Sequence, residues 1–217
     1  MKAYTHIIWD FNGTILNDVQ VGIDSANRLF AAHSLPRIAS VEEYREKFGF
    51  PIIEYYRRMG FDFDVTPYAD LAVEWVSYYL EYKKNTAIFC DIPDVLRKLK
   101  KKGLSQLILS ATETEMLEGQ VRELGIRDYF DTLLGLGNIH AYSKQEIGCK
   151  WMAEHPDAVP LMIGDTDHDA EVAAAMGVDC VLLSCGHQSR EKLEKCRCLF
   201  VADSATETLE RVFESRT

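Results

Sequence analysis

The sequence predicts an α/β fold in which a parallel sheet, covered by helices on both faces, carries an inserted helical segment. Four short apolar runs each end at a small or acidic residue, and segments with helix-terminating signals lie between them. Strands that alternate with helices are typical of a parallel sheet with two covered faces. The region of residues 17–86 departs from this alternation, because its apolar residues recur at helical spacing.

The predicted strands are runs of bulky and β-branched residues. The first of them is followed by a turn that contains Gly13. The four runs are residues 4–10, 107–110, 160–165 and 180–184.

Helices between these strands are predicted from their terminal signals, which are capping boxes, an early proline and a terminating glycine. The signals are Pro93 and Gly103 around 94–102, Thr112 with Glu115 before a helix ending near Gly125, Ser143 with Glu146 before a helix through His155, and Gly177 after 170–176.

The inserted segment is predicted to hold four helices and no strand. Its signals are the spacing of Ile23, Ala26, Leu29 and Phe30, the pair Ser40 and Glu43, Pro51 before a helix ending at Gly60, and Thr66 with Pro67 before a helix through Tyr82. We therefore expect a core of residues 1–16 and 87–217 and a helical cap of residues 17–86 that packs against it.

Composition limits the class of partner. A chain of 217 residues, 47% of them apolar, suits one core with a modest insertion. The formal net charge of −10 and the lack of a basic stripe disfavour a nucleic-acid partner, so a small ligand is expected. No apolar run approaches the roughly 20 residues of a membrane span, and no signal-peptide pattern opens the chain. These features indicate a cytoplasmic protein, for which a monomeric or homodimeric state is expected.

The six cysteines have irregular spacings, which does not indicate a disulfide framework. Cys196 and Cys198 form a C-x-C pair, but no second pair or nearby histidine stands at zinc-ligand spacing.

The candidate site lies at the carboxyl ends of the predicted strands, where open parallel sheets collect ligands. These ends supply Asp10, Ser110 and Asp165. Lys144 starts a capped helix, against the helix dipole, and such local violations are often functional. Two neighbouring carboxylates repel each other unless a cation lies between them, and Mg²⁺ binds one or two carboxylates together with a phosphate. Asp10 could then attack phosphorus.

Four stretches carry a resemblance to a known family. They are DFNGTILND at residues 10–18, LILSAT at 107–112, SKQE around Lys144 and MIGDTDHD at 162–169. In order, spacing and strand context they resemble the four motifs of the haloacid-dehalogenase superfamily, and the insertion is similar to the C1 cap of its phosphoglycolate-phosphatase-like members. The resemblance implies a Rossmann-like core with an inserted α-helical cap.

The resemblance also implies roles for individual residues. Asp10 would become an aspartyl-phosphate, Asp165 would bind Mg²⁺ with Asp10 and the backbone carbonyl of Asn12, and Asp169 would support that metal site. The implied phosphate contacts are Phe11, Gly13, Thr14, Ser110, Ala111 and Lys144. The implied activity is hydrolysis of a small phosphomonoester similar to phosphoglycolate.

Asn12 departs from the family pattern, in which an aspartate protonates the leaving oxygen at this position. General acid–base help is worth about 10² to 10⁴ in rate. The sequence leaves open a phosphatase that uses another acid or an undemanding leaving group, a slow phosphatase, and a phosphate-binding regulatory protein without turnover. A phosphonate-cleaving hydrolase would need a cap lysine such as Lys47 to form a Schiff base, and a mutase would need the missing acid.

The cap suggests a substrate loop over residues 45–52, where Gly49 and Pro51 interrupt two helices and Arg45 or Lys47 could meet a substrate carboxylate. Packing is the expected role of the cap aromatics, namely Tyr55, Tyr56, Trp75, Tyr78, Tyr79 and Tyr82. Loop roles are expected for Asp167 and His168, and structural or surface roles for His6, His33, His140, His155 and His187.

Overall fold

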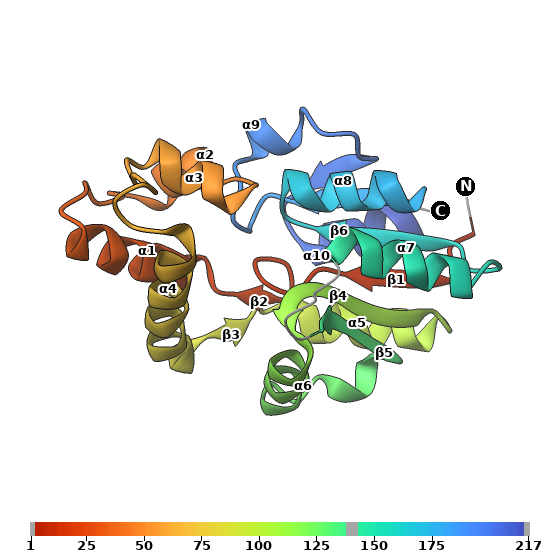
Figure 1. Cartoon of the computed structure of the whole chain (residues 1–217). Helices are drawn as coiled ribbons and strands as arrows, with labels where there is room; N and C mark the ends of the chain where they lie inside the picture. Colours follow the sequence, from red (N-terminus) through yellow and green to blue (C-terminus); the bar gives the residue numbers. More distant parts are fainter. Residues whose placement is uncertain (1–2, 138–142, 215–217) are drawn as a thin grey trace.

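The computed structural model describes residues 3–137 and 143–214. Its centre is a six-stranded, fully parallel sheet with the strand order β5-β4-β1-β6-β7-β8 (Figure 1). The strands are β1 (His6–Trp9), β4 (Ser105–Glu113), β5 (Thr132–Leu136), β6 (Pro160–Gly164), β7 (Asp179–Leu183) and β8 (Phe200–Ala202). The α/β class with a parallel sheet is therefore confirmed, and β1 lies between β4 and β6.

Helices cover both faces of the sheet because its strands are apolar on both faces. Along β1, Ile7 and Trp9 belong to one buried cluster and Ile8 to another, as the alternation of a strand requires. The first cluster packs against α5 (Ile92–Lys101), α6 (Thr114–Glu123) and α10 (Ala205–Leu209), and the second against α7 (Lys144–Glu154), α8 (Asp167–Met176) and α9 (Arg190–Leu193).

The helix-start predictions were partly wrong. The box of Ser143 and Glu146 is formed at α7. At α6, however, β4 continues to Glu113, whose carboxylate accepts the backbone N–H groups of Glu115 and Met116, so Thr112 is not the cap. A carboxylate there satisfies free N–H groups as well as a hydroxyl does.

Two other helices also start at residues that differ from the predicted ones. Helix α8 starts three residues earlier than predicted, because Thr166 and Asp169 form a capping box that the sequence reading missed. Helix α5 starts at Ile92, so Pro93 lies one position later than predicted.

The inserted segment folds into four helices, α1 (Val19–Ala32), α2 (Val41–Lys47), α3 (Ile52–Arg58) and α4 (Tyr68–Tyr82), and a short 3₁₀ turn, η1 (Lys83–Asn85), follows them. We call α1 to α4 the inserted helices. They share a third buried cluster, which includes Leu29, Phe30 and Leu71. Where the chain leaves and re-enters the core, β2 (Leu16–Asn17) pairs antiparallel with β3 (Ala87–Ile88), a ladder that was not predicted.

Figure 1 shows the inserted helices to one side of the sheet, next to the carboxyl end of β1. The described chain also contains η2 (Arg127–Tyr129) and η3 (Glu210–Glu214). No described helix is long and apolar enough to cross a membrane, and the six cysteines are free thiols.

Candidate active site

Three buried carboxylates meet at the carboxyl ends of β1 and β6. Asp10 follows β1, Asp165 follows β6, and Asp169 lies in the first turn of α8. One carboxylate oxygen from each residue lies within 4.8 Å of the other two. The order of the sheet explains this convergence, because β1 and β6 are direct neighbours.

Lys144 bridges two of these carboxylates from the first position of α7. Its Nζ donates hydrogen bonds to Oδ1 of Asp10 and, at 2.5 Å, to Oδ1 of Asp169. Burial alone would lower the pKa of Lys144, but the Asp10 and Asp169 carboxylates raise it above its ordinary value, so the ammonium stays charged.

The pKa values of the three carboxyl groups shift in different directions. Burial raises the pKa of Asp10 well above its usual value, although Lys144 opposes the shift. Burial also raises the pKa of Asp165 to about 6. The pKa of Asp169 is lowered because Lys144 outweighs the effect of burial. The positive charge near Asp10 and Asp165 is thus too small to offset the effect of burial on their pKa values.

This site fits a divalent cation. Three carboxylates and one ammonium leave two formal negative charges in a buried space, which is costly without a further cation. The donor atoms are hard oxygens of the kind that Mg²⁺ binds. Asp10, Asp165 and Asp169 could hold such an ion.

Two glycines let the backbone enclose the carboxylate of Asp165. A Cβ at Gly13, whose φ is +74°, would lie 2.3 Å from Oδ2 of Asp165, and a Cβ at Gly186 would lie 2.2 Å from the same atom. Oδ1 of Asp165 accepts the Thr14 hydroxyl at 2.9 Å, and Oδ2 accepts the His187 backbone N–H at 2.7 Å. Thr14, expected at the phosphate, therefore orients Asp165 in this structure.

The other expected phosphate contacts are divided between cavity wall and core. Ser110 and Ala111 line the cavity beside Asp10. Phe11 packs its ring in the sheet cluster. The backbone N–H of Gly13 donates to the Leu16 carbonyl and to Oδ1 of Asp18, each at 2.9 Å, so it is not directed at the cavity.

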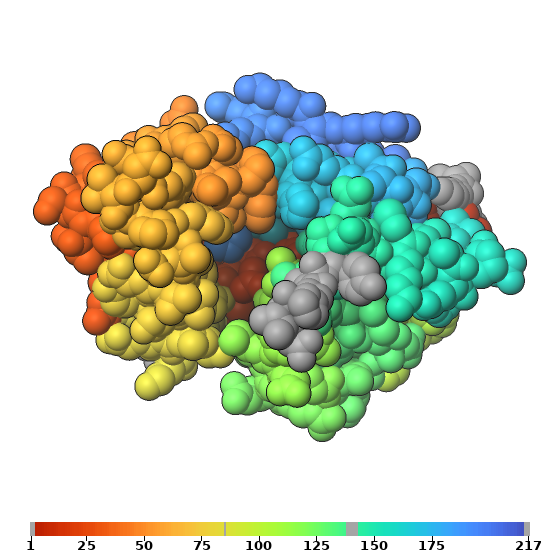
Figure 2. All heavy atoms as spheres, in the orientation of Figure 1, coloured from red at the N-terminus to blue at the C-terminus, as the bar shows by residue number. Residues whose placement is uncertain are grey.

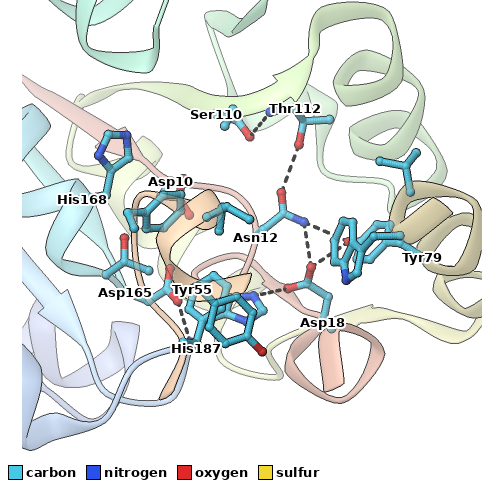
Figure 3. A pocket seen from close by; sticks show the side chains of 18 of the residues that line it. Asp10, Asn12, Asp18, Tyr55, Tyr79, Ser110, Thr112, Asp165, His168 and His187 are labelled. Carbon is cyan, nitrogen blue, oxygen red and sulfur yellow. Dashed lines mark hydrogen bonds and ion pairs between the residues drawn. The ribbon is translucent and has the colours of Figure 1, made fainter. Parts of the chain in front are cut away.

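Asn12 is held by three polar partners (Figure 3). Its Nδ2 donates to Oδ2 of Asp18 at 2.7 Å and to the Tyr79 hydroxyl at 2.9 Å. Its Oδ1 accepts the Thr112 hydroxyl at 3.0 Å. Both amide protons and the amide oxygen are therefore engaged.

Asp18 and His187 form a buried ion pair that the sequence reading missed. Nε2 of His187 lies 3.1 Å from Oδ1 of Asp18, and Nδ1 lies 2.9 Å from the Tyr44 hydroxyl. Burial lowers the pKa of His187, but Asp18 outweighs it and raises the pKa to about 9. The pKa of Asp18 is lowered, since His187 overcomes the effect of burial.

A signal for His187 was available, because the residue follows β7 by four positions and so stands near the carboxyl edge. The expectation of a structural role fits the buried ion pair of His187 with Asp18, and His187 also lines the cavity. His168, expected in a loop, lies in α8 and lines the cavity as well. His140 lies outside the described residues.

A cavity of about 530 Å³ opens between the inserted helices and the carboxyl ends of the strands. Figure 2 shows this hollow, with inserted helices on one side and the core on the other. Its wall contains Asp10, Asn12, Asp18, Gly22, Ala26, Tyr44, Phe48, Phe50, Ile52, Tyr55, Tyr56, Trp75, Val76, Tyr79, Leu80, Ser110, Ala111, Thr112, Glu113, Met116, Lys144, Asp165, Thr166, His168, Asp169 and His187.

The aromatic residues of the inserted helices pack as expected, and some of them also line the cavity. Tyr55 and Tyr56 belong to the buried cluster of the inserted helices, and Trp75 packs against that cluster. Tyr55, Tyr56, Trp75 and Tyr79 line the cavity as well. Tyr78 instead donates to Glu74 at 2.6 Å. Helix-spaced aromatics look the same in a sequence whether they face a core or a cavity.

The expected substrate loop contributes different residues from those predicted. Arg45 donates to the backbone carbonyls of Gly186 and Cys185 at 2.8 and 2.5 Å, and Lys47 pairs with Glu43 at 2.7 Å. The cavity wall instead contains Phe48 and Phe50, and it does not include Arg45, Lys47, Gly49 or Pro51.

Comparison with known proteins places this geometry in a family context. The family model described as haloacid dehalogenase-like hydrolase matches residues 7–183. A candidate pyrophosphatase, PpaX from Caldanaerobacter subterraneus subsp. tengcongensis, is 22% identical over 88% of this chain and 86% of its own length. A phosphoglycolate phosphatase from Vibrio vulnificus is 24% identical over 61% of this chain and 59% of its own.

Solved structures show the same fold. The haloacid dehalogenase-like protein SP0104 from Streptococcus pneumoniae superposes with a TM-score of 0.80 at 21% identity, covering 97% of this chain and 99% of that one. The protein tyrosine kinase PtkA from Mycobacterium tuberculosis superposes with a TM-score of 0.79 at 19% identity and the same coverage.

Proposed function

The chain belongs to the haloacid dehalogenase-like hydrolase family, and on this premise we propose that it hydrolyses phosphate monoesters by transferring the phosphoryl group to Asp10. The observation that carries the proposal is the buried cluster of Asp10, Asp165 and Asp169, bridged by Lys144, at the floor of a cavity. The names of two relatives, a candidate pyrophosphatase and a phosphoglycolate phosphatase, support phosphate chemistry.

The first step is attack by a carboxylate oxygen of Asp10 on phosphorus. Lys144 binds Oδ1 of Asp10, which leaves Oδ2 to form the new bond. The bond from phosphorus to the ester oxygen breaks, and the leaving group departs as an alkoxide or phenolate that takes a proton from solvent water. Lys144 opposes the burial that raises the pKa of Asp10, and it offsets the charge of the incoming phosphate.

The second step is hydrolysis of the aspartyl-phosphate. Water attacks phosphorus, the bond from phosphorus to Asp10 breaks, and the products are inorganic phosphate and the free carboxylate. Ser110, which lines the cavity, offers a hydroxyl to the phosphoryl oxygens. The apolar walls limit the access of bulk water.

Mg²⁺ is part of the proposal. Asp10 and Asp165 would hold it with the backbone carbonyl of Asn12, and Asp169 would support the site through Lys144 and the first turn of α8. When bound, the ion would neutralise phosphate charge and polarise a phosphoryl oxygen.

Asn12 sets the expected rate. An amide has no proton to transfer, and both N–H groups are already donated to Asp18 and Tyr79. We therefore expect esters with poor leaving groups to be hydrolysed about 10² to 10⁴ times more slowly than by a comparable site with a carboxylic acid.

No feature of the site favours the alternative of a regulatory protein without turnover. Schiff-base chemistry at Lys47 is also disfavoured, because its ammonium pairs with Glu43 outside the cavity wall.

The same proposal includes the division of the chain. Residues 17–86 would act as a cap over a core of residues 1–16 and 87–217, closing on a small phosphorylated metabolite. A cytoplasmic location and a monomeric or homodimeric state belong to the proposal.

The test is phosphate release from a panel of phosphomonoesters, including phosphoglycolate, with and without Mg²⁺. Asp10→Asn should abolish release, whereas Asp24→Asn, an exposed change on α1, should retain it. Release that survives Asp10→Asn, or that is indifferent to EDTA, would overturn the mechanism.

A further inference from the structure

We propose that the alcohol part of the substrate is an aromatic group without a carboxylate, bound by the inserted helices as an aryl or arylalkyl phosphate. This inference rests on the proposed function, because it assigns the leaving-group side of the same site. It concerns the half of the cavity that the phosphate does not occupy.

The two ends of the cavity differ in chemistry. The end at the sheet carries the polar groups, among them Asp10, Ser110 and Lys144. The end at the inserted helices is formed by aromatic and aliphatic side chains, namely Tyr44, Phe48, Phe50, Ile52, Tyr55, Tyr56, Trp75, Val76, Tyr79 and Leu80. About 530 Å³ is enough for a phosphate and a ring system.

Aromatic rings in the wall are held in place by other rings. Phe50 stacks on His168 with centroids 4.8 Å apart and planes at 26°. Trp75 stacks on Tyr79 with centroids 5.0 Å apart and planes at 24°. Such ordered rings offer faces and edges to a further ring, and this geometry favours an aromatic group over an alkyl group of similar size.

A carboxylated leaving group finds no unpaired cation among the described residues of this wall. Lys144 already binds Asp10 and Asp169, and His187 is paired with Asp18. Arg45, predicted from the sequence to meet a carboxylate, donates to backbone carbonyls instead. A second anion in this wall would lose its hydration with no free cation to offset its charge, which disfavours phosphoglycolate.

The rim of the cavity is apolar as well. Val76 and Leu80 lie on α4, line the cavity and are 42% and 36% exposed. Val73 lies on the same helix, is 72% exposed and does not belong to the cavity wall. Exposed apolar side chains that continue into a pocket are typical of a binding entrance.

Asn12 points to the same substrate class by an independent route. A phenolate departs with much less need for protonation than an alkoxide does. An active site whose Asn12 cannot donate a proton to the departing oxygen is therefore best matched to an aryl ester.

The first experiment compares four alkyl esters with Mg²⁺: benzyl, cyclohexylmethyl and ethyl phosphate, and phosphoglycolate. The leaving groups of benzyl and ethyl phosphate have similar basicity, so their difference reports recognition of the ring. We expect kcat/KM for benzyl phosphate to exceed that for ethyl phosphate by roughly 30-fold or more, from the apolar area that one ring buries. The kcat/KM for benzyl phosphate should also exceed the values for cyclohexylmethyl phosphate and phosphoglycolate.

The second experiment adds a cation at the rim. Leu80→Lys should shift the ratio of kcat/KM for phosphoglycolate to that for benzyl phosphate upward by roughly 1.5-fold to fivefold, the range of a partly exposed ion pair. Val73→Lys adds the same charge to the same helix outside the cavity and should leave the ratio unchanged. Val76→Lys serves if the first variant does not fold.

Three results would overturn the inference: equal rates for benzyl and ethyl phosphate, a preference for phosphoglycolate, or equal rates for benzyl and cyclohexylmethyl phosphate. Failure of the proposed function looks different. In that case no ester is hydrolysed, yet calorimetry with Asp10→Asn protein still measures whether benzyl phosphate binds more tightly than ethyl phosphate. Tighter binding would support the aromatic subsite, and equal binding would reject it.

Discussion

The side-chain amide nitrogen of Asn12 lies 2.7 Å from Oδ2 of Asp18. Asp18 is 2% exposed, and its other oxygen pairs with His187 at 3.1 Å. Asn12 thus connects the end of the cavity next to Asp10 to a buried ion pair beneath the inserted helices (Figure 3). We therefore expect a change at either residue to affect both turnover and stability.

Replacing Asn12 by aspartate should introduce the missing proton donor. Two carboxylates at hydrogen-bond distance share a proton, which raises the pKa of one of them and keeps an acid available near neutral pH. We expect turnover of alkyl phosphates to rise by about 10²-fold, and that of aryl phosphates to rise less. Steady-state kinetics on benzyl and phenyl phosphate would measure both effects.

The same substitution should make stability depend on pH. The raised pKa means that the folded Asn12→Asp protein holds a proton that the unfolded chain has lost, so its free energy of unfolding should fall from pH 4 to pH 7 relative to the parent. Asn17→Asp adds the same charge at an exposed position and is the control. Unchanged alkyl turnover in Asn12→Asp would show that this position does not face the departing oxygen.

His187 should stabilise the fold in a defined pH window. Its pKa is raised to about 9 by Asp18, against about 6.5 in an unfolded chain. A raised pKa contributes stability that is complete below pH 6.5 and is lost as the pH rises through 9. In EDTA, the difference in unfolding free energy between the parent and His187→Gln should therefore shrink between these two values.

Urea unfolding at several pH values would measure this difference. His33→Gln is the matched control, because His33 pairs with Glu74 at 2.9 Å but both side chains are about a quarter or more exposed. The loss of unfolding free energy in His33→Gln should be smaller than in His187→Gln, as expected for an exposed pair. A difference for His187→Gln that grows toward pH 9 would contradict the assignment of a charged His187.

Mg²⁺ should stabilise the folded chain through Asp165. A ligand that binds only the folded state adds about 2.7 kcal/mol at a concentration 100 times its Kd. Urea unfolding at increasing Mg²⁺ should show this gain in the parent. Asp165→Asn should abolish it, because one of the buried carboxylate ligands is lost.

Asp167→Asn, two residues away from Asp165, is the control variant for Asp165→Asn. Asp167 accepts the Gln188 side chain at 2.8 Å and does not belong to the cavity wall. The Asp167→Asn protein should respond to Mg²⁺ like the parent. An equal response in Asp165→Asn would place the ion elsewhere.

Much of the fold followed from local pattern. The runs that became β1, β4, β6 and β7 are continuous and apolar because they are buried on both faces, and such runs are recognisable without tertiary information. The edge strands β5 and β8 were missed. Thr132–Leu136 contains Gly135 and Phe200–Ala202 has only three residues, so neither forms a distinctive run.

The candidate site, like the fold, could be predicted only in part from the sequence. Asp10, Ser110, Lys144, Asp165 and Asp169 could be expected together because strand ends and helix starts fix their positions along a sheet edge. The contacts among Asp18, Tyr44, Tyr79 and His187 could not be predicted, since the four residues come from two helices, the start of a third and a loop, and only tertiary packing brings them together. Arg45 shows the converse case, in which a plausible substrate cation is used by two backbone carbonyls.

Covalent trapping distinguishes phosphoryl transfer to Asp10 from any other route of hydrolysis. Acid quenching during turnover of phenyl phosphate, followed by borohydride reduction, converts an aspartyl-phosphate to homoserine at the same position. Peptide mass spectrometry should find homoserine at position 10 in the parent and none in Asp10→Asn protein. Phosphate carried by another residue, or steady turnover with no modification at Asp10, would contradict a mechanism through an aspartyl-phosphate at this residue.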